Sequence, residues 1–437
     1  MAEYQAMNTG TEDGNGGTDE VSDMILSKNN LYYKMPQSLS TTIDRTFSRQ
    51  YAQRSSYSAG DTIVFDLNTG TSYLDPNNAV LSMDVNLAYT GTATAGAPPT
   101  GTLVSFGSGL GAVSLIQEIR LMSKNGTPVD RIESANVLAK IMSEWTFSDE
   151  TNKYAQMALK DHAFTTVAGF SQRAVIPLKW ISGFFRPTVR DMFIPSGLAS
   201  GMRIEITLAR ANRAFYISSA GGISNLTYTI TDPTILCMLH SLNDPTAAAL
   251  MENSAQTGLE YTFPSYFAST VTTTQSAINE QVKKAVSQCT RVFTTAFVVS
   301  GAESSLLETK DGFKSIDAGT QFGSYQYRVG SSYYPQNVID DVTEAWYVTN
   351  AAFDKNRDAL DANGLQYSTY VTNGKFTVGV PLQTHDRLNL SGLPINNSSV
   401  LELRLTLVPS AESREITTFM EYITVARTFV NKTSVKI

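Results

Sequence analysis

Residues 201–208 of the chain read GMRIEITL, and residues 400–407 read VLELRLTL. An apolar residue occupies every second position in both segments, at 202, 204, 206 and 208 and again at 401, 403, 405 and 407. A period of two is typical of a β-strand that buries one face and leaves the other toward solvent. The two segments therefore predict a pair of equivalent strands, one in each half of the chain.

A second pair of matching segments precedes these strands. Val175-Ile176-Pro177-Leu178 in the first half corresponds to Gly379-Val380-Pro381-Leu382 in the second, and a loop follows each. Each half also ends with one further strand, at 234–242 and at 419–430. The repeat unit is about half of the chain, which is far longer than a solenoid repeat, so it indicates a duplicated domain. Coincidence is the alternative, because all alternating strands resemble one another.

Turn signals separate many other short strands. Residues 63–67 and 81–87 alternate, and Asp75-Pro76-Asn77-Asn78 predicts a turn between them. Residues 90–101 are small and polar, which predicts a surface loop. Asn125-Gly126 and Asn373-Gly374 each predict a hairpin turn, because both residue types tolerate positive φ.

Helical signals are few. Residues 131–145 place apolar side chains at helical spacing, with Ser134 as a candidate cap. Residues 244–256 begin with Asp-Pro and are followed by Gly258, which frames a helix near the middle of the chain. Residues 1–20 are acidic and Gly-rich and predict a flexible tail, and residues 21–34 predict a short helix that Pro36 ends.

These signals together predict an all-β protein. Many short strands with long turn-rich connections suit two tandem eight-stranded jelly rolls. We place the first jelly roll at 37–243 and the second at 259–437. Residues 1–36 form an N-terminal arm with a short helix, and residues 244–258 form a linker helix.

Composition narrows the range of functions. The chain has 437 residues and a formal net charge of −7, and 17% of its residues are charged. An acidic chain without a long Lys/Arg run is poorly suited to gripping nucleic acid through its phosphates. No apolar stretch has the length of a membrane span, and the first residues do not resemble a signal segment. We therefore expect synthesis in a reducing compartment, with Cys237 and Cys289 as buried free thiols.

The sequence carries no clear catalytic or metal-binding motif. The three histidines, His162, His240 and His385, lie far apart, whereas a metal site on a jelly roll needs clustered ligands. His240 lies in an alternating strand, where we expect a hydrogen-bonded, partly buried side chain. No Gly-x-Ser-x-Gly elbow is present, and the glycines of residues 107–111 lack the Lys and Ser/Thr of a phosphate-binding loop. We predict no catalytic, cofactor-binding or metal-binding residue and no cofactor.

Two further features of the sequence, a pair of glutamates and an aromatic-rich segment, can each be interpreted in more than one way. Glu205 and Glu402 lie on the alternate face of the matching strands, which favours a solvated or interface role over paired glycosidase carboxylates. Residues 322–334 (FGSYQYRVGSSYY) are rich in aromatic side chains and are interpreted as a long loop. Structural packing, a subunit contact and sugar binding all remain open for this segment.

The order of these segments resembles that of a known family. The resemblance rests on the following segments: IQEIRLMSKNGT at 116–127, VDRIE at 129–133, the helix that follows, the run from Ile176-Pro177-Leu178 to 203–208, and Ser391-Gly392-Leu393 before 401–407. This succession is similar to the double jelly-roll major capsid proteins of DNA viruses, and it looks closest to the polinton-like virus, adintovirus and virophage group. The resemblance covers roughly residues 37–430, and its specificity comes from the order and duplication of the segments.

The resemblance implies a structural, non-enzymatic role. It implies a homotrimer in which three double jelly rolls form a pseudo-hexameric capsomer, and capsomers that tile an icosahedral shell in the virion. It also implies penton and minor capsid proteins as partners, no sequence-specific binding of nucleic acid, and room for an internal membrane beneath the shell. The loops would form outward towers, and the N-terminal arm would face the interior or clamp a neighbour.

Two other functions fit an all-β chain of this kind. One is a two-domain β-sandwich adhesin or receptor-binding protein that recognises glycans, and the other is a β-sandwich glycoside hydrolase. An adhesin would bind glycans without assembling, and a hydrolase would lose activity when one carboxylate is neutralised. A capsid subunit would form a stable trimer without turnover.

Overall fold

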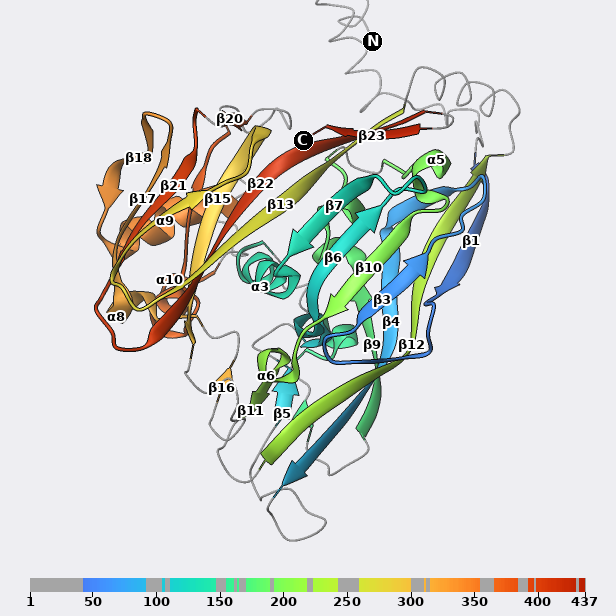
Figure 1. The fold of residues 1–437 in the computed structure, drawn as a ribbon, viewed down its shortest axis with the longest axis horizontal. Coiled ribbons are helices and arrows are strands. Elements are labelled where there is room, and N and C mark those ends of the chain that lie inside the picture. The colour runs from blue at the N-terminus through green and yellow to red at the C-terminus, as the bar shows by residue number, and fades with distance from the viewer. Residues whose placement is uncertain are drawn as a thin grey trace, which may run out of the picture.

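The computed structural model shows two β-sandwiches side by side (Figure 1). Figure 1 draws one sandwich from strands of the first half of the chain and the other from strands of the second half. The structure describes residues 42–91, 104–106, 111–146, 155–160, 163–164, 170–188, 192–217, 223–242, 259–299, 310–311, 315–353, 365–383, 392–396, 398–429 and 432–436.

Eight strands form the first sandwich. They are β1 (Thr42–Tyr51), β3 (Thr62–Asp66), β4 (Tyr73–Gly91), β6 (Ile116–Met122), β7 (Pro128–Glu133), β9 (Phe170–Pro177), β10 (Arg203–Leu208) and β12 (Ile223–Leu242). One sheet has the order β1-β12-β4-β9 and the other has the order β3-β10-β6-β7, and every pairing is antiparallel. The short strand β2 (Ser56–Ser58) pairs with β12. Counted along the chain, the sheets run first-eighth-third-sixth and second-seventh-fourth-fifth, which is a jelly roll.

The second sandwich repeats this order. Its strands are β13 (Leu259–Thr273), β14 (Ala277–Val282), β15 (Val286–Val299), β17 (Phe322–Val329), β18 (Ser332–Ile339), β19 (Thr377–Pro381), β21 (Leu401–Leu407) and β22 (Ser413–Phe429). The sheets have the orders β13-β22-β15-β19 and β14-β21-β17-β18. Two short strands extend the first of these sheets, β20 (Leu393–Ile395) beside β15 and β23 (Lys432–Lys436) beside β22. The prediction of two tandem eight-stranded jelly rolls is confirmed.

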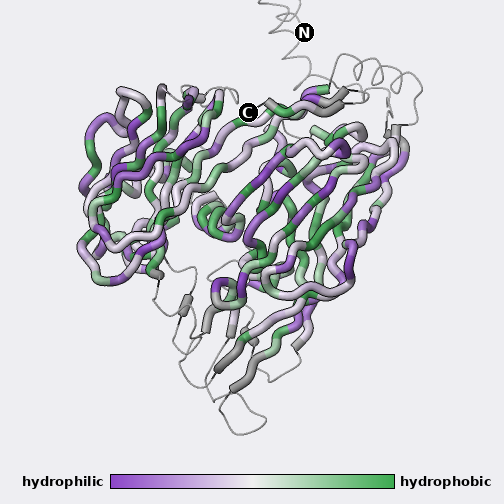
Figure 2. Tube along the Cα trace, viewed as in Figure 1, coloured by the Kyte–Doolittle hydropathy of each residue, from purple (hydrophilic) through white to green (hydrophobic). Residues whose placement is uncertain are grey.

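The repeated segments occupy equivalent places in the two sandwiches. The strand at 201–208 becomes β10, the seventh strand of the first half, and the strand at 400–407 becomes β21, the seventh strand of the second. The eight predicted inward positions are all buried, including Ile204, Ile206, Leu403 and Leu405. Pro177 and Pro381 each end the sixth strand of their half. Figure 2 shows hydrophobic and hydrophilic residues alternating along these strands.

Helices connect the fifth and sixth strands in each half. They are α3 (Ala135–Trp145) in the first half and α9 (Val342–Phe353) and α10 (Tyr367–Thr372) in the second. The shorter helical turns are η1 (Gly111–Leu115), η2 (Ala155–Ala158), η3 (Leu178–Trp180), η4 (Gly183–Phe185), α5 (Ser196–Ala199), α6 (Ala211–Ala214) and α8 (Ala318–Gln321). The helix predicted at 131–145 begins only at Ala135, because residues 131–133 pair with β6 as part of β7. Ser134 adopts a left-handed φ of 53° and makes no side-chain capping bond.

A small third layer lies at one end of the molecule. It contains β5 (Val104–Phe106), β8 (Ala163–Phe164), β11 (Phe215–Ile217) and β16 (Lys310–Asp311), in the order β16-β11-β5-β8. In Figure 1 this sheet lies at the bottom, whereas the C-terminal strand β23 lies at the top. Connections of both jelly rolls therefore gather at the end opposite β23.

Three local predictions are wrong. Asp75-Pro76-Asn77-Asn78 is not a turn between strands but lies within β4, where the register against β12 shifts between Leu236 and Met238. Asn373-Gly374 is not a hairpin turn, because it follows the helix α10, and Gly374 takes a φ of 61° there. Residues 322–334 are not a long loop: they form β17, its turn and the start of β18, and Tyr325 and Tyr327 are buried in the core.

The Asn125-Gly126 hairpin is confirmed, since β6 and β7 pair across it. The acidic tail, the helix at 21–34, the linker helix at 244–258 and residues 92–101 of the loop predicted at 90–101 lie outside the described residues, whereas residues 90 and 91 belong to β4. The proposed domain boundaries therefore remain predictions.

Candidate functional site

The helix α3 lies in the seam between the two sandwiches. It belongs to the first half of the chain, yet Trp145 stacks on Phe353 with ring centroids 5.4 Å apart and meets Tyr370 edge-on at 5.8 Å. The hydrophobic stripe of a surface helix normally covers one face, but α3 is buried from Ala135 to Met142 and again at Trp145. The helix is therefore a core element shared by both halves.

Lys140 of α3 is a buried cation in this seam. Its Nζ lies 3.4 Å from Glu144 Oε1, 3.4 Å from Ser315 Oγ and 5.4 Å from the centroid of the Phe297 ring. Ser315 and Phe297 belong to the second half. A buried charge is tolerated only when it is paired and hydrogen-bonded, so these contacts fix the position of α3 against the second sandwich.

The loop after β9 forms a second contact across the seam. Phe184 of η4 packs against the rings of Tyr261 and Phe263 on β13, each 5.2 Å away, and Tyr261 Oη donates a hydrogen bond of 2.7 Å to the Phe184 carbonyl. Gly183 approaches the backbone of β13 so closely that a Cβ at this position would lie 1.7 Å from the Pro264 carbonyl oxygen. Only glycine fits this approach.

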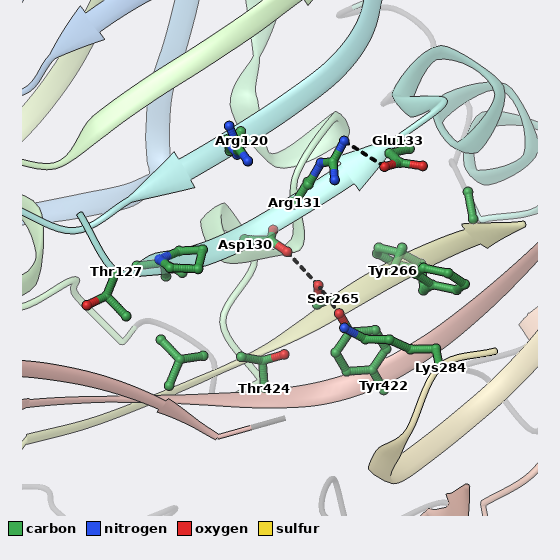
Figure 3. Close-up of a pocket in the computed structure, with 15 residues that line it drawn as sticks. Arg120, Thr127, Asp130, Arg131, Glu133, Ser265, Tyr266, Lys284, Tyr422 and Thr424 are labelled. Atoms are coloured by element: carbon green, nitrogen blue, oxygen red, sulfur yellow. Dashed lines mark hydrogen bonds and ion pairs between the residues drawn. The ribbon is translucent and has the colours of Figure 1, made fainter. Parts of the chain in front are cut away.

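Asp130 on β7 carries a buried carboxyl into the seam. Ser265 Oγ on β13 donates a hydrogen bond of 2.5 Å to its Oδ1, and Ser182 Oγ donates one of 2.9 Å to its Oδ2. Burial raises the pKa of the Asp130 carboxyl to about 6, although the two serine hydrogen bonds act in the opposite direction. Figure 3 shows Asp130, Ser265 and Tyr422 as one chain of polar groups that links β7, β13 and β22.

An ion pair lies on the face of the second sandwich that α3 covers. The Arg291 guanidinium contacts Glu421 Oε2 at 2.5 Å, and the same guanidinium lies 5.1 Å from the centroid of the Phe353 ring. Burial alone would raise the pKa of Glu421, but the positive charges of Arg291 and Arg186 hold it at about 2. Arg186 from the first half also donates to Tyr266 Oη on β13. The seam thus contains a buried polar network as well as apolar contacts.

A cavity of about 500 Å³ opens beside this network. Its walls come from β6 and β7 on one side and from β13, β22 and β23 on the other, and Figure 3 shows the two sets facing each other. The polar lining residues are Arg120, Thr127, Asp130, Arg131, Glu133, Ser265, Tyr266, Lys284, Tyr422 and Thr424. Pro128, Val129, Phe267, Ala268 and Val435 supply apolar wall.

The two carboxylates that line the cavity are engaged, since Asp130 accepts from two serines and Glu133 pairs with Arg131 at 2.8 Å. Within the described part of the chain, no group of three or more His, Cys, Asp and Glu residues is placed to hold a metal ion. The contacts given above join the two sandwiches across the seam.

The structure places the residues that the sequence singled out at separate sites. His240 on β12 is fully buried rather than partly buried as predicted: it stacks on Phe193 with ring centroids 4.4 Å apart, and its Nε2 has no hydrogen-bond partner and lies 3.9 Å from Asp75 Oδ2. Cys237 and Cys289 are both free and buried, as predicted. His162 and His385 lie outside the described residues.

The two matching glutamates lie in different sandwiches. Glu205 is 3.7 Å from Arg120, and Glu402 contacts Arg404 at 3.1 Å and Arg328 at 3.5 Å. Both are partly exposed members of surface ion pairs, which agrees with the outer face predicted for them.

Each sandwich has an edge strand that carries large exposed apolar side chains. β1 is an edge strand of the first sandwich, and Phe47 and Tyr51 on it are 64% and 71% exposed. β18 is an edge strand of the second sandwich, where Val338 is 55% exposed. Figure 1 places β18 at the left end of the molecule and β1 at the right end. Large apolar side chains on open sheet edges mark surfaces that associate with other protein.

Sequence reasoning missed the seam. Asp130 and Ser265 are 135 residues apart, and neither lies in a recognisable motif. The available signal is an acid inside an otherwise strand-like segment, VDRIE, which also fits an exposed position. Among the helices that the structure describes, none has the length and apolar character needed to span a membrane.

Comparison with known proteins supports the fold at the level of structure alone. No family model and no curated protein sequence matches the chain. A chain of the PBCV-1 virus capsid is similar in structure with a TM-score of 0.62 at 12% identity, covering 93% of this chain and 99% of that one. A chain from the Sputnik virophage gives 0.60 at 11%, with 94% and 92% covered. The Faustovirus major capsid protein gives 0.59 at 8%, with 93% and 94% covered.

Proposed function

We propose that this chain is a non-enzymatic major capsid protein, which forms homotrimers that tile an icosahedral viral shell. The described fold is a double jelly roll, and the similar structures named above come from the shells of the PBCV-1 virus and Faustovirus and from the Sputnik virophage. Each of those likenesses extends over at least nine-tenths of both chains. The chain would accordingly reside in the virion after synthesis inside the host cell.

One observation supports this proposal most directly. The two jelly rolls pack against each other at one seam, and an edge strand with exposed apolar side chains lies at each far end. Trp145, Lys140 and Asp130 all bind across the seam, so the two sandwiches behave as one rigid block. The strands β1 and β18, which carry exposed apolar side chains, lie at opposite ends of the molecule in Figure 1. A rigid block with two different open ends suits head-to-tail closure into a ring.

The proposal extends to the organisation of the chain. We place the arm at 1–36, the first jelly roll at 37–243, the linker helix at 244–258 and the second jelly roll at 259–437. The partners would be two further copies, neighbouring trimers, penton and minor capsid proteins, and a membrane beneath the shell if the virus has one. The net charge of −7 argues against direct binding to the phosphates of the genome. Within the double jelly-roll proteins, the polinton-like virus, adintovirus and virophage group remains the proposed group.

The test is the solution mass of the purified chain by light scattering, with negative-stain images of the same peak. A particle of three times the 47.6 kDa chain mass with a six-cornered outline is the expected result. A monomer that persists at high protein concentration would overturn the proposal and direct attention to glycan binding. Binding on a glycan array by such a monomer would support the adhesin alternative.

A further inference from the structure

The internal duplication predicts which surfaces of two copies meet. Within one chain, the fifth strand of the first half, β7, packs against the first strand of the second half, β13, and Asp130 is hydrogen-bonded to Ser265 between them. The corresponding strands at the open ends are β18, the fifth strand of the second half, and β1, the first strand of the first half. Both are edge strands with exposed apolar side chains.

We infer that β18 of one copy packs against β1 of a second copy in the way that β7 packs against β13 within one chain. The inference rests on the proposed trimer and names its contact surfaces. Because β18 and β1 are different surfaces, the contact is head-to-tail, and three copies close a ring. Six sandwiches would then be joined by alternating seams within and between chains.

Strand pairing gives the residue correspondence for the first strands. In the first half, Pro177 pairs with Val80, Val80 with Leu236, and Leu236 with Arg49. In the second half, Pro381 pairs with Arg291, Arg291 with Glu421, and Glu421 with Tyr266. Pro177 and Pro381 end equivalent strands, so Arg49 is the counterpart of Tyr266. Two residues further on, Tyr51 is the counterpart of Ala268.

The same reasoning applies to the fifth strands. Ile206 pairs with Ile119, which pairs with Ile132, and Leu405 pairs with Tyr325, which pairs with Ile339. Ile206 and Leu405 are equivalent positions in the repeated segments, so Ile132 corresponds to Ile339. Arg131 therefore corresponds to Val338.

The counterparts differ sharply in exposure. Ala268 and Tyr266 are 8% and 2% exposed at the seam, whereas Tyr51 is 71% exposed and Arg49 is also open to solvent. Arg131 and Ala268 line the same seam cavity from opposite sides. By correspondence, Val338 of one copy and Tyr51 of the next face each other across the new seam.

The outer sheet faces show the same contrast. In the second sandwich, Arg291, Phe293 and Phe297 point outward from β15 and are buried, because α3 and α9 cover them. In the first sandwich, Ser82, Asp84 and Asn86 occupy the outward positions of β4 and remain partly exposed. Counted from its first residue, α9 carries Tyr347 where α3 carries the buried Lys140, and Tyr347 is 68% exposed. α9 of a second copy thus fits over the uncovered face.

Charge also fits this partner. Arg45 and Arg49 lie exposed on β1, on the same face as Phe47 and Tyr51. Asp340 and Glu344 lie exposed at the end of β18 and the start of α9. No ion pair joins any of these four charges to another described residue of the chain. Opposite charges on the two open ends favour contact between unlike ends over contact between like ends.

A cysteine cross-link tests the geometry. The variant with Tyr51→Cys and Val338→Cys in one chain is treated with a short flexible bismaleimide and run on a denaturing gel. The expected product is a covalent trimer, while either single substitution stays at the mass of one chain. The native Cys237 and Cys289 are buried, and burial raises the pKa of Cys237 to about 12, so neither competes for the reagent. Pairing Tyr51→Cys with Val408→Cys, another exposed apolar position, is the matched control and should give no cross-link.

A disruption experiment gives an independent result. Tyr51→Asp and Val338→Asp should each convert the trimer to monomer in light scattering without lowering the melting temperature of the monomer, and Val408→Asp should leave the trimer intact. If the wild type is trimeric but both variants remain trimers, or if single-cysteine chains cross-link to each other, the inference is overturned and the proposed function stands. A monomeric wild type overturns both.

Discussion

Asp130 of the first jelly roll and Ser265 of the second are joined by a hydrogen bond of 2.5 Å across the seam. Both side chains are buried, and Tyr422 Oη lies 3.2 Å from the same serine oxygen. Among the described residues, no cation is in hydrogen-bond contact with this carboxyl, which accepts from two serine hydroxyls and a backbone N–H. Its ionised form is therefore poorly compensated, which makes the joint sensitive to pH.

The sign of this sensitivity follows from linkage. Burial raises the pKa of Asp130 from 3.8 to about 6, so the folded chain binds the proton more tightly than the unfolded chain does. This group therefore stabilises the fold at low pH, and its contribution falls as pH rises from about 4 to about 6, by a total on the order of 3 kcal/mol. Asp130→Asn keeps the shape of the neutral acid and removes the titration. We expect the variant to gain stability over the wild type between pH 5 and 7, as measured by urea unfolding at a series of pH values.

Substitution in the buried pair of Arg291 and Glu421 should lower the stability of the fold, whereas Asp130→Asn should raise it. Glu421→Gln leaves the Arg291 guanidinium buried without a counter-charge, and this should cost about 3–5 kcal/mol of unfolding free energy. Glu402→Gln is the matched control, because it removes an acid from a partly exposed pair with Arg404 and should cost less than about 1 kcal/mol. Denaturant midpoints of the two variants check the difference. Equal losses would mean that the buried pair is no more important than a surface pair.

The duplicated strands could be predicted from the sequence because their signal is local. Residues 202–208 and 401–407 alternate with a period of two, and a strand with one buried face requires only that pattern. The Asn125-Gly126 turn could be predicted for the same reason, since its two strands are adjacent in the chain and pair directly. Pro177 and Pro381 then fixed the alignment of the halves.

Predictions that depended on distant partners failed. Asp75 forms a local turn-like structure, accepting from Asn77 N at 2.9 Å and from Asn78 Nδ2 at 2.7 Å, but β12 lies alongside and keeps the segment within β4. The aromatic run at 322–334 suggested a loop, yet Tyr327 Oη reaches Thr294 of β15 inside the core. The seam has only one weak local signal, the acid in VDRIE, because its two sides come from different halves of the chain.

The stacking of Trp145 on Phe353 predicts a strong dependence of folding on α3. Trp145→Ala removes a buried ring from contact with Phe353 and Tyr370 and leaves a cavity between the halves, so we expect a loss of about 3–5 kcal/mol. Tyr347→Ala on α9, where the side chain is 68% exposed, should change the stability of the monomer by less than about 0.5 kcal/mol. Thermal melts of both variants make the comparison. A Trp145→Ala chain as stable as wild type would show that α3 does not join the sandwiches.

The close approach of Gly183 to Pro264 predicts an unusually costly glycine substitution. A Cβ at Gly183 would lie 1.7 Å from the Pro264 carbonyl oxygen, and backbone on both sides of the seam would have to move to relieve this overlap. Gly183→Ala should therefore separate η4 from β13 and weaken the packing of Phe184 against Tyr261. Gly60→Ala is the matched control, because its Cβ would meet nothing within 4 Å and the variant pays only for a left-handed φ of 86°, about 1–2 kcal/mol. Hydrogen exchange resolved by peptide should show faster exchange in β13 for Gly183→Ala but not for Gly60→Ala. Unchanged protection of β13 in Gly183→Ala would mean that the seam tolerates the extra atom and is not tightly packed there.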